Sequence, residues 1–514
     1  FGDMITTRNW ANIWLNEGFA TFFSRLYLTK DRGDDEGDYI RLGEIRSFKR
    51  ADKNKRRPTV DYVYDEPFEL FSSHVYAKGS LILTMLRDVL GEDGFWRSIR
   101  NYTNENKLKN VETTDLKKMI EMTTGQNLDW FFKQWLYEPG FPSYDVSWTY
   151  NQRKKELSIH VKQMQDLKTA SLFKMPIKIL VDSGDKKEHI IWVEDLDSVY
   201  KIKSEKRPKM VIFNSGQKVP SNLKMQKSVA DLKYQLKKAS NSLDRIWAAQ
   251  ELSKKKGRKV VEYTLLEAAK NDSFWAVRSE AYYALGRLKT NITSEDIDWI
   301  KDKETDNRVK RSFIKILKYQ KNNLEVNKFL EDIIVSDTSY YSISEAIRTL
   351  VVVDTSKAKP LIDKLLNTES HNDVIRKSAL SYFGQVQTTS NYIRLKELAK
   401  YGKFSFPSRP TIINELSKYQ KKRPSTFDFI LTFFDDNDRF VRMAVIAQVG
   451  NYGSQSNHEL LDVMVEKDPV LSINATRAKA KIKKRKNSKS KKLDSKTIEI
   501  LDKKLNAIKN IIND

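Results

Sequence analysis

Residues 1–20 read FGDMITTRNWANIWLNEGFA, and the segment WLNEGFA (14–20) is the most informative part of this chain. Aromatic and apolar residues recur at helical spacing over residues 9–29, and we expect the helix to stop at the polar segment DRGDDEGD (31–38). One acid, Glu17, lies inside this apolar pattern directly before Gly18. A surface glutamate near a helix end is the ordinary interpretation, and a functional carboxylate is the alternative.

A second stretch, HVYAKGSLILTML (74–86), predicts an apolar helix from about residue 77 to residue 90, ended by Gly91. Tyr76 stands at its start, where a tyrosine hydroxyl is either a donor to a reacting oxygen or a buried group satisfied by the backbone. Lys78 is expected to be structural, and Gly79 to allow close approach of a neighbouring helix. His74 would share a face with Tyr76 only if this segment were extended.

These two segments resemble the aminopeptidase N family of zinc metallopeptidases, the gluzincins, whose relatives include leukotriene hydrolase. WLNEGFA, with FGD upstream, resembles the segment that follows the family's H-E-x-x-H helix, and residues 74–86 resemble its S-Y-x-K-G-A-x-V-L-x-M-L element. The resemblance implies that Glu17 is the third zinc ligand, beside two histidines. It also implies that Tyr76 is catalytic, donating a hydrogen bond to the oxyanion of the tetrahedral intermediate. A carboxylate and two imidazoles leave Zn²⁺ a position for the water that it activates.

The family has eighteen residues between its second zinc-binding histidine and the ligand glutamate, whereas sixteen precede Glu17 here. With the family's Gln-Trp added, the resemblance puts that histidine three residues before Phe1. The chain's own histidines form no H-E-x-x-H; they are His74, His160, His189, His371 and His458. We therefore expect a C-terminal fragment of a zinc aminopeptidase, truncated just after the H-E-x-x-H helix and inactive alone. The family's G-A-M-E-N-type segment, whose glutamate receives the substrate amine, is absent as well.

The pattern along the chain predicts a multidomain, mainly α protein. Residues 1–142 are expected to be the helical C-terminal part of a thermolysin-like catalytic domain, and residues 143–222, with period-two alternation, a small β-sandwich. Residues 223–475 carry a repeat of about 33 residues, typical of a HEAT-like solenoid. The dipeptides that mark it begin at Val277, Val309, Ile375 and Val441, with weaker copies around Arg245, Ile343 and Arg409. Residues 476–514 are expected to hold a basic segment and a terminal helix.

Charge and composition limit the partners. The formal net charge is +24, and ten Lys or Arg lie without an acid in residues 477–492, from Arg477 to Lys492. A solvated basic face is the ordinary interpretation, and contact with an anionic surface is the alternative; no nucleic-acid-reading motif accompanies the run. The absence of cysteine excludes disulfides and thiolate metal sites. No apolar run is long enough for a transmembrane helix, so we expect a soluble protein. Of the two locations, we expect the cytoplasm in preference to secretion.

Two functions of different classes fit these observations. In the first, the chain is part of a zinc-dependent aminopeptidase that removes N-terminal residues from peptides. In the second, it is a non-catalytic, peptidase-like scaffold that binds protein or nucleic acid through its helical repeats and basic run. Retention of Glu17 and Tyr76 favours the enzyme, because a scaffold needs neither.

Overall fold

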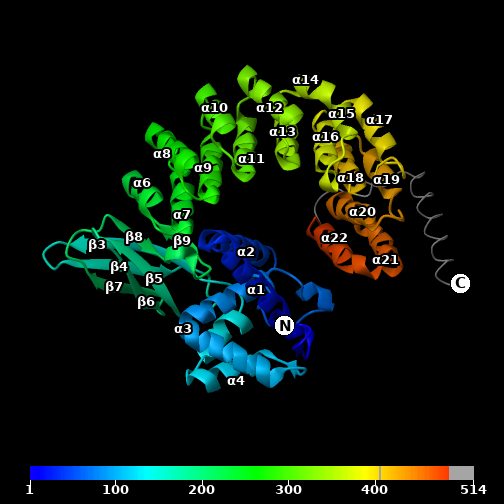
Figure 1. Ribbon diagram of the computed structural model, residues 1–514. Helices are drawn as coiled ribbons and strands as arrows, with labels where there is room; N and C mark the ends of the chain where they lie inside the picture. The colour runs from blue at the N-terminus through cyan, green and yellow to red at the C-terminus, as the bar shows by residue number, and fades with distance from the viewer. Residues whose placement is uncertain (405–406, 486–514) are drawn as a thin grey trace. The chain divides into compact units, whose positions relative to one another are not determined.

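The computed structural model describes residues 1–404 and 407–485, and the chain divides into two compact units, residues 1–288 and 289–514. The first unit opens with a helical part, continues with two β-sheets and closes with further helices (Figure 1). The described part of the second unit is helical. The mainly helical, multidomain fold class is confirmed. The predicted domain limits after residues 142, 222 and 475 stay predictions.

The helical part of the first unit is built around three long helices that pack on one another, α1, α2 and α3. The two-residue strands β1 (Thr6–Thr7) and β2 (Asn110–Val111) pair in parallel beside them. A π-helical turn, Lys133–Tyr137, directly follows α5. The helices are α1 Trp14–Arg32, α2 Asp34–Asn54, α3 Ala77–Asn106, α4 Thr113–Thr124 and α5 Asp129–Phe132.

The expectation that the helix stops within DRGDDEGD (31–38) is confirmed. Helix α1 continues to Arg32, Gly33 leaves helical geometry at φ 94°, and α2 begins at once. Three acids occupy the first turn of α2, where carboxylates favour the positive end of the helix dipole: Asp34, Asp35 and Glu36. The acidic segment is therefore a helix start. Gly91 also leaves helical geometry, at φ 73°, where the helix from residue 77 was expected to end, and a second helical stretch continues α3 to Asn106.

Seven strands in two sheets follow the helical part. One sheet has the order β7-β4-β3-β9 and the other the order β6-β5-β8, and only the β3–β9 pair is parallel. Tyr144 of β3 meets Phe213 of β8 edge to face, with ring centroids 5.1 Å apart, so the two sheets share a core. The strands are β3 Ser143–Asn151, β4 Glu156–Gln163, β5 Met175–Asp182, β6 Lys186–Val193, β7 Asp197–Lys203, β8 Met210–Phe213 and β9 Asn222–Met225.

Short helices fill the rest of both units. The first unit ends with α6 Val229–Lys238, α7 Ser242–Leu252, α8 Lys259–Asn271 and α9 Trp275–Leu288. The second contains α10 Ser294–Asp302, α11 Asn307–Ile316, α12 Leu324–Ser336, α13 Tyr340–Val353, α14 Thr355–Ala358, α15 Ile362–Leu366, α16 Val374–Gln385, α17 Thr389–Leu398, α18 Arg409–Ser417, α19 Ser425–Leu431, α20 Arg439–Tyr452, α21 His458–Lys467 and α22 Ser472–Lys484. The apolar residues that marked the repeat are buried near the starts of α9, α11, α16 and α20.

The basic run is only partly within the described residues. Its first part lies on α22, where Arg477 is exposed, and Arg485 donates hydrogen bonds to the carbonyls of Gly450 and Gly453. The rest of the run and the predicted terminal helix lie outside the described residues. Across residues 1–404 and 407–485, no helix is both long enough and apolar enough to cross a membrane.

Candidate functional site

Glu17 lies in the first turn of α1, and buried hydrogen bonds fix this end of the helix. Trp14 Nε1 donates to Thr113 Oγ1 at 2.8 Å, and Thr113 Oγ1 donates to Asn12 Oδ1 at 2.6 Å. Trp14 is fully buried, and Thr113 is the first residue of α4. Because buried polar groups are costly to leave unpaired, this chain of donors holds the starts of α1 and α4 together.

Two glycines bring α1 against α3. A Cβ added to Gly18 would lie 2.9 Å from the Gly79 Cα, and one added to Gly79 would lie 2.8 Å from the Gly18 Cα. Both neighbours are backbone atoms, which cannot move aside as the end of a flexible side chain can. The close approach expected for Gly79 is therefore present, and Gly18, which the sequence did not single out for this purpose, is the other half of the contact.

This contact brings Glu17 and Tyr76 together across 59 positions of sequence. Tyr76 is the residue before α3, and both side chains are partly exposed. The pKa of the Tyr76 hydroxyl is raised, first by burial and then by the negative charge of Glu17 and a hydrogen bond to its carboxylate. A phenol that donates to a carboxylate is held as the neutral, donating form.

The donor chemistry at Glu17 suits zinc, but the described residues do not complete a site. A carboxylate oxygen is an accepted Zn²⁺ ligand, and Glu17 takes part in no ion pair of the described residues. Structural and catalytic zinc sites use three or four protein ligands. Within the described residues no three His, Cys, Asp or Glu side chains come together.

His74 faces a different group from Tyr76. Its ring is buried, Nδ1 lies 3.1 Å from Ser72 Oγ, and Nε2 lies 3.7 Å from Asp52 Oδ1 at the end of α2. Burial lowers the pKa of His74, and the nearby Asp52 carboxylate offsets this in part. The ring therefore ties the segment before Tyr76 to α2.

Lys78 is completely buried, as a structural role requires, but it has an unusual environment. Its amine makes no hydrogen bond among the described residues and lies 5.3 Å from the centre of the Phe48 ring. Burial lowers the pKa of Lys78 to about 7, while Asp52 acts to raise it and Arg57 to lower it further. Arg57 also fixes the loop before α3, donating to Leu70 O at 2.7 Å and to Ser72 Oγ at 2.8 Å.

A buried polar network that the sequence analysis missed joins all three long helices. Arg25 of α1 pairs with Glu44 of α2 at 3.1 Å, and Ser80 Oγ of α3 donates to the same carboxylate at 3.0 Å. Arg25 also donates to Thr84 Oγ1 at 2.5 Å. The available signal was an arginine on the apolar face of α1, which requires a buried acid elsewhere in the chain.

The remaining histidines lie away from this region in sequence and in their contacts. His160 on β4 pairs with Asp197 of β7, and His189 lies on β6. His371 lies within four residues of the start of α16, and His458 begins α21. Within the described part of the first unit, neither His160 nor His189 joins Glu17 in a group of side chains that could hold a metal.

Comparison with known proteins shows which family and which relatives this chain is similar to. Residues 1–135 match the Peptidase family M1 domain. The chain is 31% identical over 193 residues to the tricorn protease-interacting factor F2 of Thermoplasma acidophilum, which is 36% of this chain and 24% of that protein. It is 33% identical over 146 residues to the probable aminopeptidase 1 of Saccharolobus solfataricus, 28% of this chain and 19% of that protein.

The fold extends this likeness beyond the matched domain. The crystal structure of Legionella pneumophila aminopeptidase A in complex with aspartic acid superposes with a TM-score of 0.64 at 16% identity. That alignment covers 94% of this chain and 64% of the Legionella chain. At this identity the likeness concerns the fold. Residues 1–135, the domain at the N-terminus, belong to the M1 peptidase family, and the chain's matches span about a quarter or less of the curated relatives' lengths. Intact enzymes of this family are zinc metallopeptidases that act on peptides.

Proposed function

We propose that this chain functions in aminopeptidase catalysis, with Glu17 as a zinc ligand and Tyr76 as the donor to the oxyanion. The observation that carries the proposal is the close backbone contact of Gly18 with Gly79, which brings the neighbouring Glu17 and Tyr76 together. A metal ligand and an oxyanion donor must lie side by side, because both act on the same carbonyl oxygen.

Each residue has one task in this proposal. Zinc, when bound, polarises the scissile carbonyl and lowers the pKa of a bound water. Glu17 supplies one oxygen ligand from the first turn of α1, where the buried Trp14–Thr113 hydrogen bond limits its movement. Tyr76 is protonated at neutral pH, because a phenol ordinarily has a pKa near 10, and can therefore donate to an oxygen that becomes negative during the reaction. The substrate class is peptides with a free N-terminus, as in the family.

The two histidine ligands and the general base of the family are not encoded in these 514 residues, which contain no H-E-x-x-H. One carboxylate is too few ligands for tight zinc binding, so we expect the 514 residues alone to be inactive. Activity requires a segment carrying H-E-x-x-H in addition to this chain.

The test joins an H-E-x-x-H-Q-W segment of the family in frame to Phe1 and measures zinc content and hydrolysis of aminoacyl 4-nitroanilides. Glu17→Gln is expected to lower both the zinc stoichiometry and the activity. Tyr76→Phe is expected to leave zinc content unchanged and to lower kcat by about 10²- to 10³-fold, the usual loss for one oxyanion donor. Matched controls are Glu105→Gln and Tyr27→Phe, which alter exposed side chains on α3 and α1.

Two outcomes would contradict the proposal. Full zinc content and activity in Glu17→Gln would remove Glu17 from the metal site. A zinc-loaded, folded protein without hydrolysis in any variant would instead favour the non-catalytic scaffold.

A further inference from the structure

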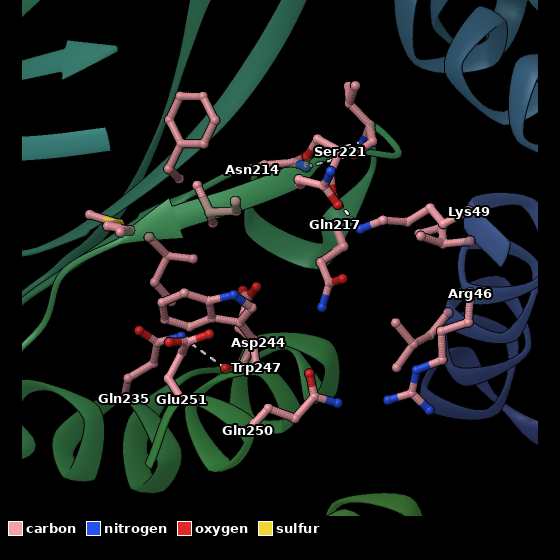
Figure 2. Close-up of a pocket in the computed structure, with 18 of the residues that line it drawn as sticks. Arg46, Lys49, Asn214, Gln217, Ser221, Gln235, Asp244, Trp247, Gln250 and Glu251 are labelled. Carbon is pink, nitrogen blue, oxygen red and sulfur yellow. Dashed lines mark hydrogen bonds between the residues drawn. The ribbon is translucent and has the colours of Figure 1, made fainter. Parts of the chain in front are cut away.

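A pocket of about 510 Å³ lies inside the first unit, where α2, the segment from β8 to β9 and α7 meet (Figure 2). Neither Glu17 nor Tyr76 lines it. The volume is within the range of small-molecule sites, which form preferentially where domains or layers meet. Nothing in the proposed peptidase chemistry uses this pocket.

One wall of the pocket is apolar. Ile45 of α2, Val219 and Leu223 of the β8–β9 segment and the indole of Trp247 on α7 contribute to it. Trp247 is only partly buried, and Lys227 Nζ lies 5.5 Å from the centre of its ring. Such a wall favours the binding of a molecule that has an apolar or aromatic part.

A cation without an acidic partner among the described residues lies one helical turn after Ile45 on α2, across the pocket from Trp247 in Figure 2. Lys49 Nζ donates to the backbone carbonyl of Ser221 at 2.8 Å and pairs with no carboxylate among the described residues. Burial lowers the pKa of Lys49 to about 8, so the amine is still mainly protonated at pH 7. An ammonium group has three donors, and the Ser221 carbonyl occupies one of them. Arg50, one residue further along α2, is exposed and adds positive charge at the mouth of the pocket.

The acids around the pocket are already engaged by other donors. Asp244 accepts from Ser215 Oγ at 2.6 Å and from the Gly216 amide at 2.9 Å. Glu280 accepts from Arg46 at 2.7 Å and from Gln250 at 3.1 Å. Glu251 pairs with Lys254. The described residues therefore leave Lys49 without a carboxylate, and an acidic group bound in the pocket would be its ionic partner.

We propose that this pocket binds a small organic anion, with its acidic group at Lys49 and its apolar body against Trp247 and Ile45. Figure 2 shows Gln217 and Gln250 reaching toward the space between α7 and α2. Gln217 Nε2 donates to Leu243 O at 3.2 Å and Gln250 Nε2 donates to Glu280, so each amide retains one N–H for polar atoms of the ligand. A neutral ligand would leave the desolvated ammonium of Lys49 unpaired, and a bare inorganic anion would leave the apolar wall uncovered. Both parts of the ligand therefore contribute to binding.

The test uses the whole 514-residue chain and isothermal titration calorimetry at pH 7 with three probes: 2-naphthoate, 2-naphthamide and inorganic phosphate. We expect 2-naphthoate to bind one to one, and the amide and phosphate to bind at least tenfold more weakly. Lys49→Met should weaken 2-naphthoate at least tenfold, whereas Lys49→Arg should keep most of the affinity. Lys53→Met, an exposed lysine on the same helix, is the matched control and should change nothing.

The proposal fails if 2-naphthoate does not bind, if the amide binds equally well, or if Lys49→Met binds like the unaltered chain. Because Lys49→Arg keeps the charge, a loss of binding in Lys49→Met with retention in Lys49→Arg separates the charge effect from misfolding. Protection of Lys49 from an amine-reactive reagent by 2-naphthoate, read by peptide mass spectrometry, reports the site directly. Equal labelling with and without the probe would also refute it.

Discussion

At the scale of single residues, Lys78 has an unusual environment, because this charged side chain is completely buried. It is fully buried at the start of α3, two positions after Tyr76, and its amine faces an aromatic ring instead of a hydrogen-bond acceptor. An ammonium over the face of a phenyl ring recovers part of the lost hydration, since the ring carries negative charge on its face. Lys78 therefore favours the packing of the α3 start in which its ammonium lies over the Phe48 ring, because this contact stabilises the buried charge.

Lys78 also gives the stability of the chain a pH dependence of known sign. The pKa of Lys78 is about 7 in the folded chain and 10.5 as the ordinary value. Between these values the unfolded chain binds more protons, so this group makes folding more favourable as pH rises, by at most about 1.4 kcal/mol per pH unit. Lys78→Met removes the effect. The variant should therefore be more stable than the parent at pH 6.5, with a difference that shrinks toward pH 9.5, as measured by urea unfolding. Lys53→Met, in which an exposed lysine is lost, should show no such trend, and a pH-independent difference for Lys78→Met would contradict the assignment.

At the scale of helices, the contact of Gly18 with Gly79 sets the distance between α1 and α3. The backbones approach so closely that no Cβ fits at either position without displacing main-chain atoms. The Arg25–Glu44 pair and its hydrogen bonds to α3 then fix the rotation of the three long helices about one another. The separation of Glu17 from Tyr76 is a consequence of this packing.

Gly79→Ala should consequently destabilise the first unit, by about 1–3 kcal/mol, the usual cost of overpacking a close-packed site. The matched control is Gly43→Ala on α2, where an added Cβ meets nothing within 4 Å. There alanine should stabilise the helix by about 0.5–1 kcal/mol, because glycine loses more entropy on folding. Urea unfolding followed by tryptophan fluorescence measures both. A neutral or stabilising Gly79→Ala would mean that α1 and α3 are free to separate.

Particular residues show what the sequence could and could not predict. The helix containing Glu17 and the repeat marked by Val309 followed from apolar periodicity, because burial of one face leaves a period in the sequence. The approach of Glu17 to Tyr76 was predictable only through the family resemblance, since 59 intervening positions carry no distance information. The Gly18–Gly79 contact leaves no side-chain pattern at all. The end of α1 within segment 31–38 was predictable from its polar residues and Gly33. The start of α2 at Asp34 was not, because the same carboxylates suit a loop and the first turn of a helix.

At the scale of the whole molecule, one ion pair recurs through the helical repeats. An arginine on one helix pairs with an aspartate 26 or 27 positions later, which lies just before the corresponding helix of the next repeat. Within the first unit Arg245 and Asp272 form such a pair, and within the second unit so do Arg409 with Asp436 and Arg442 with Asp468. Each arginine is mostly buried, so the pair links successive repeats where apolar side chains alone would allow sliding.

Arg409 tests this arrangement, because its guanidinium binds both oxygens of Asp436, at 2.8 and 2.6 Å, with 4% and 8% of the two side chains exposed. Arg409→Met leaves a buried, uncompensated carboxylate and should cost about 3–5 kcal/mol at neutral pH. Asp436→Asn added to this variant should recover part of the loss, since the remaining group is uncharged. Arg394→Met, which breaks the exposed pair with Asp363, should cost less than about 1 kcal/mol.

Repeats couple mainly to their neighbours, so in Arg409→Met hydrogen exchange should rise in α18, α19 and α20 while α1 and α3 keep their protection. Equal effects of the two arginine substitutions, or a loss of protection spread evenly over the chain, would show that the buried pair does not connect the repeats.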